Sequence, residues 1–199
     1  MSGQPKKVVL IGDFGVGKST TLMQLCRRRF GAAVTEALDM KQKEFCVQNG
    51  RKKITLQIWD TAGLEKTDSL AVNFFRHSAG VVLVFDTSKV DSFHNVDSWY
   101  NRATTEARDV QVLLLGNNFG SCEVAVSEDQ ARAYCQRKGI QYFSISARNG
   151  TNVDEAFQAL AEEIYKTEQE YASGSEDIVE TVTLGGQDQN PRRGCFSRC

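Results

Sequence analysis

One glycine-rich segment, residues 12–19, constrains this chain more than any other feature of its sequence. The segment reads GDFGVGKS and fits the pattern G-x-x-x-x-G-K-[ST]. It follows an apolar run, Lys6–Ile11, that predicts a buried strand, and it leads into residues 19–29, which predict a helix. Its glycines allow backbone N–H groups to face phosphate oxygens, its lysine adds a charge, and its serine hydroxyl can ligate Mg²⁺. We therefore predict a phosphate-binding loop and keep a purely structural glycine turn as the alternative.

Strand-like and helical patterns alternate along the rest of the chain. Apolar segments with the composition of strands occur at residues 6–11, 40–48, 53–60, 80–86, 110–116 and 140–145. Asn49-Gly50 favours an antiparallel hairpin with a two-residue turn between the second and third segments. Ser127 and Gln130 form a capping box, and the helix that they begin should end at Gly139. This alternation predicts an α/β fold with a six-stranded, mostly parallel sheet that has one antiparallel hairpin strand and is flanked by helices.

The last periodic segment sets the domain boundary. Apolar residues recur between positions 153 and 164 at the spacing of a helix with one buried face. From residue 172 onward, glycine, serine, aspartate and glutamate dominate and this periodicity stops. We therefore expect one domain over residues 1–171 and a flexible tail over residues 172–199 that ends in two cysteines.

Composition excludes several classes of protein. The chain has 24 Lys+Arg and 25 Asp+Glu, so it lacks the basic field that holds nucleic acid by its phosphates. Its longest strictly apolar run, residues 81–85, is too short to span a bilayer. The first eleven residues lack the apolar segment of a signal peptide, so we expect a cytoplasmic protein. No zinc-ligand spacing appears among the cysteines and histidines. The first four cysteines should be reduced and mostly buried: Cys26, Cys46, Cys122 and Cys135.

A second motif, Trp59-Asp60-Thr61-Ala62-Gly63, stands at the end of a predicted strand. An acid there can hold the hydration shell of Mg²⁺, and the glycine can bring its N–H to a terminal phosphate. With this motif, residues 6–171 resemble the Ras-like small GTPases and, within them, the Rab group. Further matches are Thr35 with Asp39, FFRHSAG, VLVFDTS, residues 92–99, Gly116-Asn117 and Ser146-Ala147-Arg148. The resemblance implies a P-loop small G domain that binds GTP or GDP with Mg²⁺.

The resemblance also implies a role for each matching position. Ser19 and Thr35 would ligate Mg²⁺, and Asp60 would hold the metal through water. Lys18 would bind the β- and γ-phosphates, and Gly63 would sense the γ-phosphate. The full set of implied nucleotide-binding residues is Gly12, Asp13, Phe14, Gly15, Val16, Gly17, Lys18, Ser19, Thr20, Phe30, Gly63, Asn117, Asn118, Ser146, Ala147 and Arg148.

Four departures from the family pattern lie around this predicted site. Leu64 replaces the glutamine that orients the attacking water, and an isobutyl group cannot hydrogen-bond water. Phe14 stands beside the γ-phosphate, where the family usually has a small residue. Lys18 and Thr35 are two residues closer along the sequence than is usual in the family. Together with Leu64, they are the implied catalytic positions. Residues 117–120, Asn-Asn-Phe-Gly, lack the aspartate that accepts two hydrogen bonds from guanine. We therefore expect slow or defective hydrolysis and weakened guanine selectivity.

The resemblance also suggests partners and a membrane anchor. Met40, Trp59 and Phe74 match the apolar triad with which Rabs meet effectors, although core packing is an alternative role for the two aromatic residues. Cys195 and Cys199 correspond to cysteines that receive geranylgeranyl chains, and two unmodified thiols are the alternative. We expect a trafficking switch on the cytosolic face of endomembranes, with effectors, an exchange factor and an activating protein as partners.

Two other functions stay open at this point. A pseudo-GTPase scaffold would keep the fold and bind partners with weak or lost nucleotide binding. A P-loop kinase or ATPase is disfavoured, because no arginine-rich lid follows and Asp60-Thr61-Ala62-Gly63 matches GTPases better.

Overall fold

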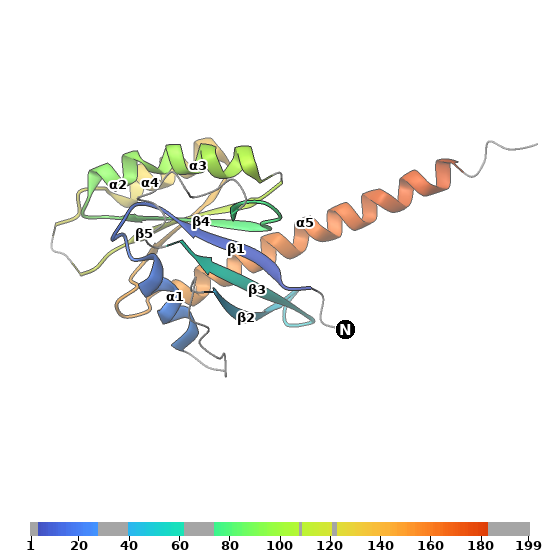
Figure 1. Cartoon of the computed structure of the whole chain (residues 1–199), viewed down its shortest axis with the longest axis horizontal. Coiled ribbons are helices and arrows are strands. Elements are labelled where there is room, and N and C mark those ends of the chain that lie inside the picture. Colours follow the sequence, from blue (N-terminus) through green and yellow to red (C-terminus); the bar gives the residue numbers. More distant parts are fainter. Residues whose placement is uncertain (1–3, 28–39, 62–73, 108, 121–122, 183–199) are drawn as a thin grey trace, which may run out of the picture. The chain divides into compact units, whose positions relative to one another are not determined.

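The structure is a computed structural model that describes residues 4–27, 40–61, 74–107, 109–120 and 123–182 (Figure 1). The chain divides into two compact units, residues 1–165 and 166–199, and the sheet lies in the first. The strands are β1 (Lys6–Ile11), β2 (Met40–Val47), β3 (Lys52–Asp60), β4 (Gly80–Asp86), β5 (Gln111–Asn117) and β6 (Gln141–Ile145). The helices are α1 (Lys18–Arg27), α2 (Val90–His94), α3 (Val96–Glu106), α4 (Glu128–Lys138) and α5 (Val153–Val182).

The six strands form one sheet in the order β2-β3-β1-β4-β5-β6. β2 pairs antiparallel with β3, and the other neighbouring strands pair parallel. This confirms the predicted six-stranded, mostly parallel sheet with one antiparallel strand. Each parallel pairing needs a crossover connection, and the helices between the strands supply most of these connections.

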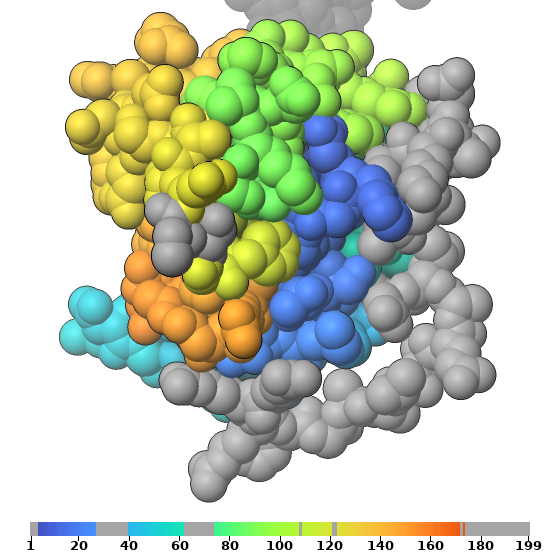
Figure 2. Space-filling model, turned by 90° about the vertical axis from the view of Figure 1, so that its left-hand side faces the viewer, coloured from blue at the N-terminus to red at the C-terminus, as the bar shows by residue number. Residues whose placement is uncertain are grey.

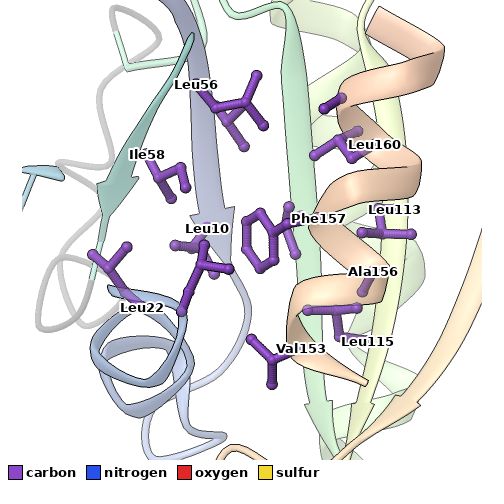
Figure 3. Close-up of a cluster of buried hydrophobic side chains, with 14 of the residues drawn as sticks. Leu10, Leu22, Leu56, Ile58, Leu113, Leu115, Val153, Ala156, Phe157 and Leu160 are labelled. Carbon is purple, nitrogen blue, oxygen red and sulfur yellow. The ribbon is translucent and has the colours of Figure 1, made fainter. Parts of the chain in front are cut away.

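Helices pack on both faces of this sheet, as predicted. Leu22 of α1 and Phe157 of α5 meet Leu10 of β1 in one buried cluster (Figure 3). The other cluster joins Val9 of β1 to residues of α3 and α4, including Ala103. Successive residues of β1 therefore enter opposite clusters, which explains why this strand reads as a continuous apolar run.

The hairpin between β2 and β3 differs from the predicted two-residue turn. Val47 pairs with Lys52, so four residues connect the strands. Gln48 and Asn49 have positive φ angles of 52° and 54°, and the Arg51 N–H donates to the Gln48 carbonyl at 3.2 Å. Because Gln48 also takes the left-handed conformation, it leaves the strand and widens the turn. The antiparallel pairing itself is confirmed.

The ends of α4 agree with the sequence, whereas the end of α5 does not. Ser127 and Gln130 make both hydrogen bonds of the capping box, and Gly139 is the C-cap of α4. Helix α5 continues to Val182, although the sequence predicts a tail from residue 172. No proline interrupts residues 172–182, so the backbone can stay helical after the apolar periodicity has stopped. Residues 183–199 lie outside the described part.

The cysteines are less uniformly buried than predicted. Cys135 is buried, Cys26 is intermediate and Cys46 on the edge strand β2 is exposed, so the expected burial is wrong for Cys46. Cys122 lies outside the described residues. Burial raises the pKa of Cys135 to about 11, so this thiol stays protonated at neutral pH. In the part of the chain that the structure describes, no helix has the length and apolar character needed to cross a membrane.

Candidate nucleotide-binding site

The predicted site residues gather where parallel strands end. Residues 12–17 follow β1, residue 61 follows β3, residues 118–120 follow β5, and residues 146–148 follow β6. Parallel strands end at the same edge of a sheet, and ligands of open α/β sheets bind there. Figure 2 faces this edge and shows the blue phosphate loop close to the green segment after β4 and the orange segment after β6.

Lys18 is the first residue of α1 and is almost completely buried. Its side chain is 3% exposed, and its Nζ donates to the carbonyls of Gly12 at 2.9 Å and Asp13 at 2.8 Å. The loop carbonyls therefore surround the Lys18 ammonium group. A helix N-terminus adds unpaired N–H groups and a partial positive charge at the same place. This arrangement suits a bound phosphate.

Ser19 and Asp60 join the start of α1 to the end of β3. The Ser19 hydroxyl donates to Asp60 Oδ2, and Asp60 is 5% exposed. Thr61 Oγ1 donates to the Leu10 carbonyl at 2.7 Å, which fixes the segment after β3 beside β1. A hydroxyl and a carboxylate are hard oxygen donors, so this pair fits Mg²⁺. Thr35, the other implied ligand, lies outside the described residues.

Asn117 ties three of the loops together and is completely buried. Its Nδ2 donates to the Val16 carbonyl at 2.9 Å, and its Oδ1 accepts from the Ala147 N–H at 3.0 Å. Its backbone carbonyl accepts from the Thr87 N–H at 3.1 Å. Asn117 therefore holds the phosphate loop, the end of β4 and the segment after β6 next to one another. Its implied contact with guanine stays a prediction.

The loop after β5 has a self-contained geometry. Asn118 Oδ1 accepts from the Gly120 N–H at 2.7 Å, and Gly120 has φ +85°. A Cβ on Gly120 would lie 4.0 Å from Nη1 of Arg148. The Phe119 ring comes within 2.9 Å of the place that a Cβ on Gly17 would occupy. Phe119 thus packs on the phosphate loop, a contact that the sequence did not suggest.

The end of β4 is ordered by the Asp86 carboxylate, which lies in the VLVFDTS segment but was given no role by the sequence analysis. Burial of Asp86 opposes its ionisation, but hydrogen bonds from the N–H and hydroxyl of Ser88 and from Lys89 outweigh this effect and lower the pKa of Asp86. The Asp86 N–H donates to the Ser92 hydroxyl oxygen at 3.1 Å. These bonds fix the turn that leads from β4 into α2.

The aromatic members of the predicted triad meet at the surface of the sheet. Trp59 and Phe74 are edge to face with ring centroids 6.4 Å apart, and Met40 pairs with Trp59 across β2 and β3. Lys7 Nζ lies 5.8 Å from the Trp59 ring and 5.9 Å from the Phe74 ring, and burial lowers the pKa of Lys7. Both rings are only partly buried, so they are available to a partner while also packing against their neighbours.

Several implied positions cannot be placed in this site. Phe30, Gly63 and Leu64 lie outside the described residues, as do Cys195 and Cys199. Phe14 is described, and its side chain is 63% exposed on the phosphate loop. The described positions therefore support the phosphate and magnesium side of the site more fully than the base side.

Comparisons with known proteins agree with this geometry. The Ras family model matches residues 7–166. Ras-related protein Rab7 of Pisum sativum and Ras-related protein RABG3f of Arabidopsis thaliana are each 37% identical to the chain, over 95% of both sequences. Ras-related protein Rab7 of Drosophila melanogaster is 37% identical over 96% of both sequences. The family match includes all four loops of the candidate site.

Replacing Gly17 by alanine should destabilise the phosphate loop. The added Cβ would lie 2.3 Å from Asn117 Nδ2 and 2.9 Å from the Phe119 ring. Gly15→Ala is the matched control, because Gly15 also has a positive φ, +76°, but no atom lies within 4 Å of its added Cβ. We expect Gly17→Ala to lose about 1–3 kcal/mol more unfolding free energy than Gly15→Ala in urea denaturation. Equal losses would show that packing around Gly17 is not tight.

Proposed function

The chain belongs to the Ras family of small GTPases and is Rab-like, and we propose that it acts as a guanine-nucleotide-dependent switch in membrane trafficking. The observation that carries this proposal is the buried Lys18 ammonium, held at the phosphate loop beside the Ser19–Asp60 pair. A buried cation at a helix N-terminus is suited to a polyphosphate. Asp60 of β3 bonds to Ser19 and Asn117 of β5 bonds to the Val16 carbonyl, and both contacts support this proposal.

Each described residue has a defined part in this proposal. Lys18 and the N–H groups of residues 15–19 would bind the phosphates. Ser19 and Asp60, with Thr35, would hold Mg²⁺, which neutralises phosphate charge when bound. Asn117 and Ala147 would position the base side of the pocket through their mutual hydrogen bond. Met40, Trp59 and Phe74 would contact effectors when the nucleotide changes.

The most direct test identifies the nucleotide released from purified, heat-denatured protein. We expect GDP or GTP in nearly equal molar ratio to the chain, because Lys18, Ser19 and Asp60 lie together at the phosphate loop. Recovery of adenine nucleotide would refute the guanine assignment. Protein that retains no nucleotide and binds none on addition would favour the pseudo-GTPase scaffold instead.

Gly120 provides a test of base selectivity. Gly120→Asp should raise the preference for GTP over ATP by about tenfold or more, because a carboxylate there could accept two hydrogen bonds from guanine. Two features of the structure oppose the full gain, namely the positive φ of residue 120 and the nearby Arg148 guanidinium.

Calorimetry with both nucleotides can separate these effects. Gly120→Ala reproduces the backbone strain without the carboxylate and is the control for Gly120→Asp. Adding Arg148→Ala to Gly120→Asp removes the competing cation and should increase the gain further. An unchanged GTP/ATP preference in Gly120→Asp and in the double variant would place the base elsewhere.

We also propose that hydrolysis is slow. Leu64 cannot orient water, so the unassisted rate should be about 10⁻⁴ s⁻¹ or lower in a single-turnover assay. Leu64→Gln should recover part of the rate at most, since Phe14 stands in the phosphate loop next to the γ-phosphate position. Adding Phe14→Gly should recover more. Rapid hydrolysis by the unsubstituted chain would refute this account.

The final part of the proposal is attachment to membranes through prenylated Cys195 and Cys199. Replacing both by serine should move the protein from the membrane fraction to the cytosol, because the neighbouring arginines contribute only about 1 kcal/mol each near an anionic surface. Replacing Ser197 by alanine is the control, since it alters the same segment but leaves both thiols. Membrane fractionation that does not change in the double variant would exclude the lipid anchor.

A further inference from the structure

The carboxylate of Asp13 in the phosphate loop is bound by two side chains from a distant part of the chain. Asn95 Nδ2 donates to one carboxylate oxygen at 2.7 Å, and Trp99 Nε1 donates to the other at 2.8 Å. Each oxygen therefore has its own neutral donor. The three residues connect the loop after β1 to the junction of α2 and α3. Both donors lie in residues 92–99, which the sequence analysis matched to the family without giving either residue a role.

The position of Asn95 is informative because it is the N-cap residue of α3. An asparagine at an N-cap usually accepts a hydrogen bond from the backbone of the following turn. Here the Asn95 side chain makes no such cap bond and donates to Asp13 instead. The backbone N–H of Trp99 donates to the Asn95 carbonyl at 3.1 Å, so the two residues lie one helical turn apart. Their side-chain donors therefore lie on the same side of α3.

Asp13 also connects these donors to the ammonium group of the site. Its carbonyl accepts from Lys18 Nζ at 2.8 Å while its carboxylate accepts from α3. A carboxylate in a loop that binds a polyanion would repel the ligand if it turned toward the phosphates. Hydrogen bonds from Asn95 and Trp99 hold the carboxylate at α3 and leave the carbonyl with the lysine.

We infer that Asn95 and Trp99 are positioning residues for nucleotide binding, which act by holding the Asp13 carboxylate against α3. This inference rests on the proposed function, because the ligand is the phosphate group of a nucleotide. It extends the site to a helix that makes no predicted contact with nucleotide. If a partner displaced α3, the movement would be transmitted to Lys18 through Asp13 alone.

The inference predicts faster nucleotide release when either donor is removed. Trp99→Phe keeps the ring and deletes the N–H, and we expect release of a fluorescent GDP analogue from the full chain to become about tenfold faster. Asn95→Ala should act in the same direction. Asn101→Ala is the matched control, because this exposed α3 amide donates to Asp97 at 3.1 Å and does not contact the loop. Release from Asn101→Ala should stay within about twofold of the unsubstituted chain.

A second substitution separates positioning from a merely structural role. Asp13→Asn removes the charge that the donors restrain, so adding it to Trp99→Phe should slow release again relative to Trp99→Phe alone. A structural defect caused by losing the indole would not be relieved in this way. Release that is as fast or faster in the double variant, or that is unchanged in Trp99→Phe and Asn95→Ala, would overturn the inference.

Hydrogen–deuterium exchange distinguishes a failure of this inference from a failure of the proposed function. Without added nucleotide, amide exchange in residues 12–18 should be faster in Trp99→Phe and Asn95→Ala than in Asn101→Ala. If the unsubstituted chain binds no guanine nucleotide, the proposed function fails, and exchange still tests whether α3 holds the loop. If the chain binds nucleotide and neither release nor exchange responds, the inference about Asn95 and Trp99 fails and the proposed function stands.

Discussion

The buried amide of Asn117 is the interaction on which the arrangement of the site depends. Its two polar atoms bond to the phosphate loop through Val16 and to the segment after β6 through Ala147. An unpaired amide at a fully buried position would cost about 1–3 kcal/mol, so both loops must stay within reach for the fold to be stable. Close approach then demands glycine at position 17, where a Cβ would collide with the same amide.

The sheet makes this interaction possible by bringing distant segments to one edge. β5 lies beside β4, and the pairing of Asp86 with Asn117 places the end of β4 next to the buried amide. The bonds around Asp86 fix the turn into α2, which in turn sets the start of α3 and the donors to Asp13. The turn after β4 is thus connected to the phosphate loop through the bonds from Asn95 and Trp99 to Asp13.

Sequence patterns predicted those features that depend on local chemistry. The strand before the phosphate loop, the capping box at Ser127 and the alternation of strands and helices each have a short-range cause and were confirmed. The wider hairpin arises from the left-handed conformation of Gln48, for which the residue type gives little signal. The contacts of Asp13 with Asn95 and Trp99 join residues 82 and 86 positions apart, so periodicity and spacing could not reveal them.

The loop after β5, where the sequence predicts contact with the base, has a shape that does not depend on the predicted recognition residue. The loop after β5 keeps its conformation through the bond between Asn118 and Gly120 and through the packing of Phe119 on Gly17. Neither contact needs an aspartate at position 120. The loop therefore keeps its shape without a carboxylate at position 120, whereas the phosphate loop depends on bonds from Lys18 and on the bond from Asn117 to Val16. Substitutions at Lys18 or Asn117 would therefore remove hydrogen bonds that join segments of the fold, whereas the glycine at position 120 leaves the bond from Asn118 in place.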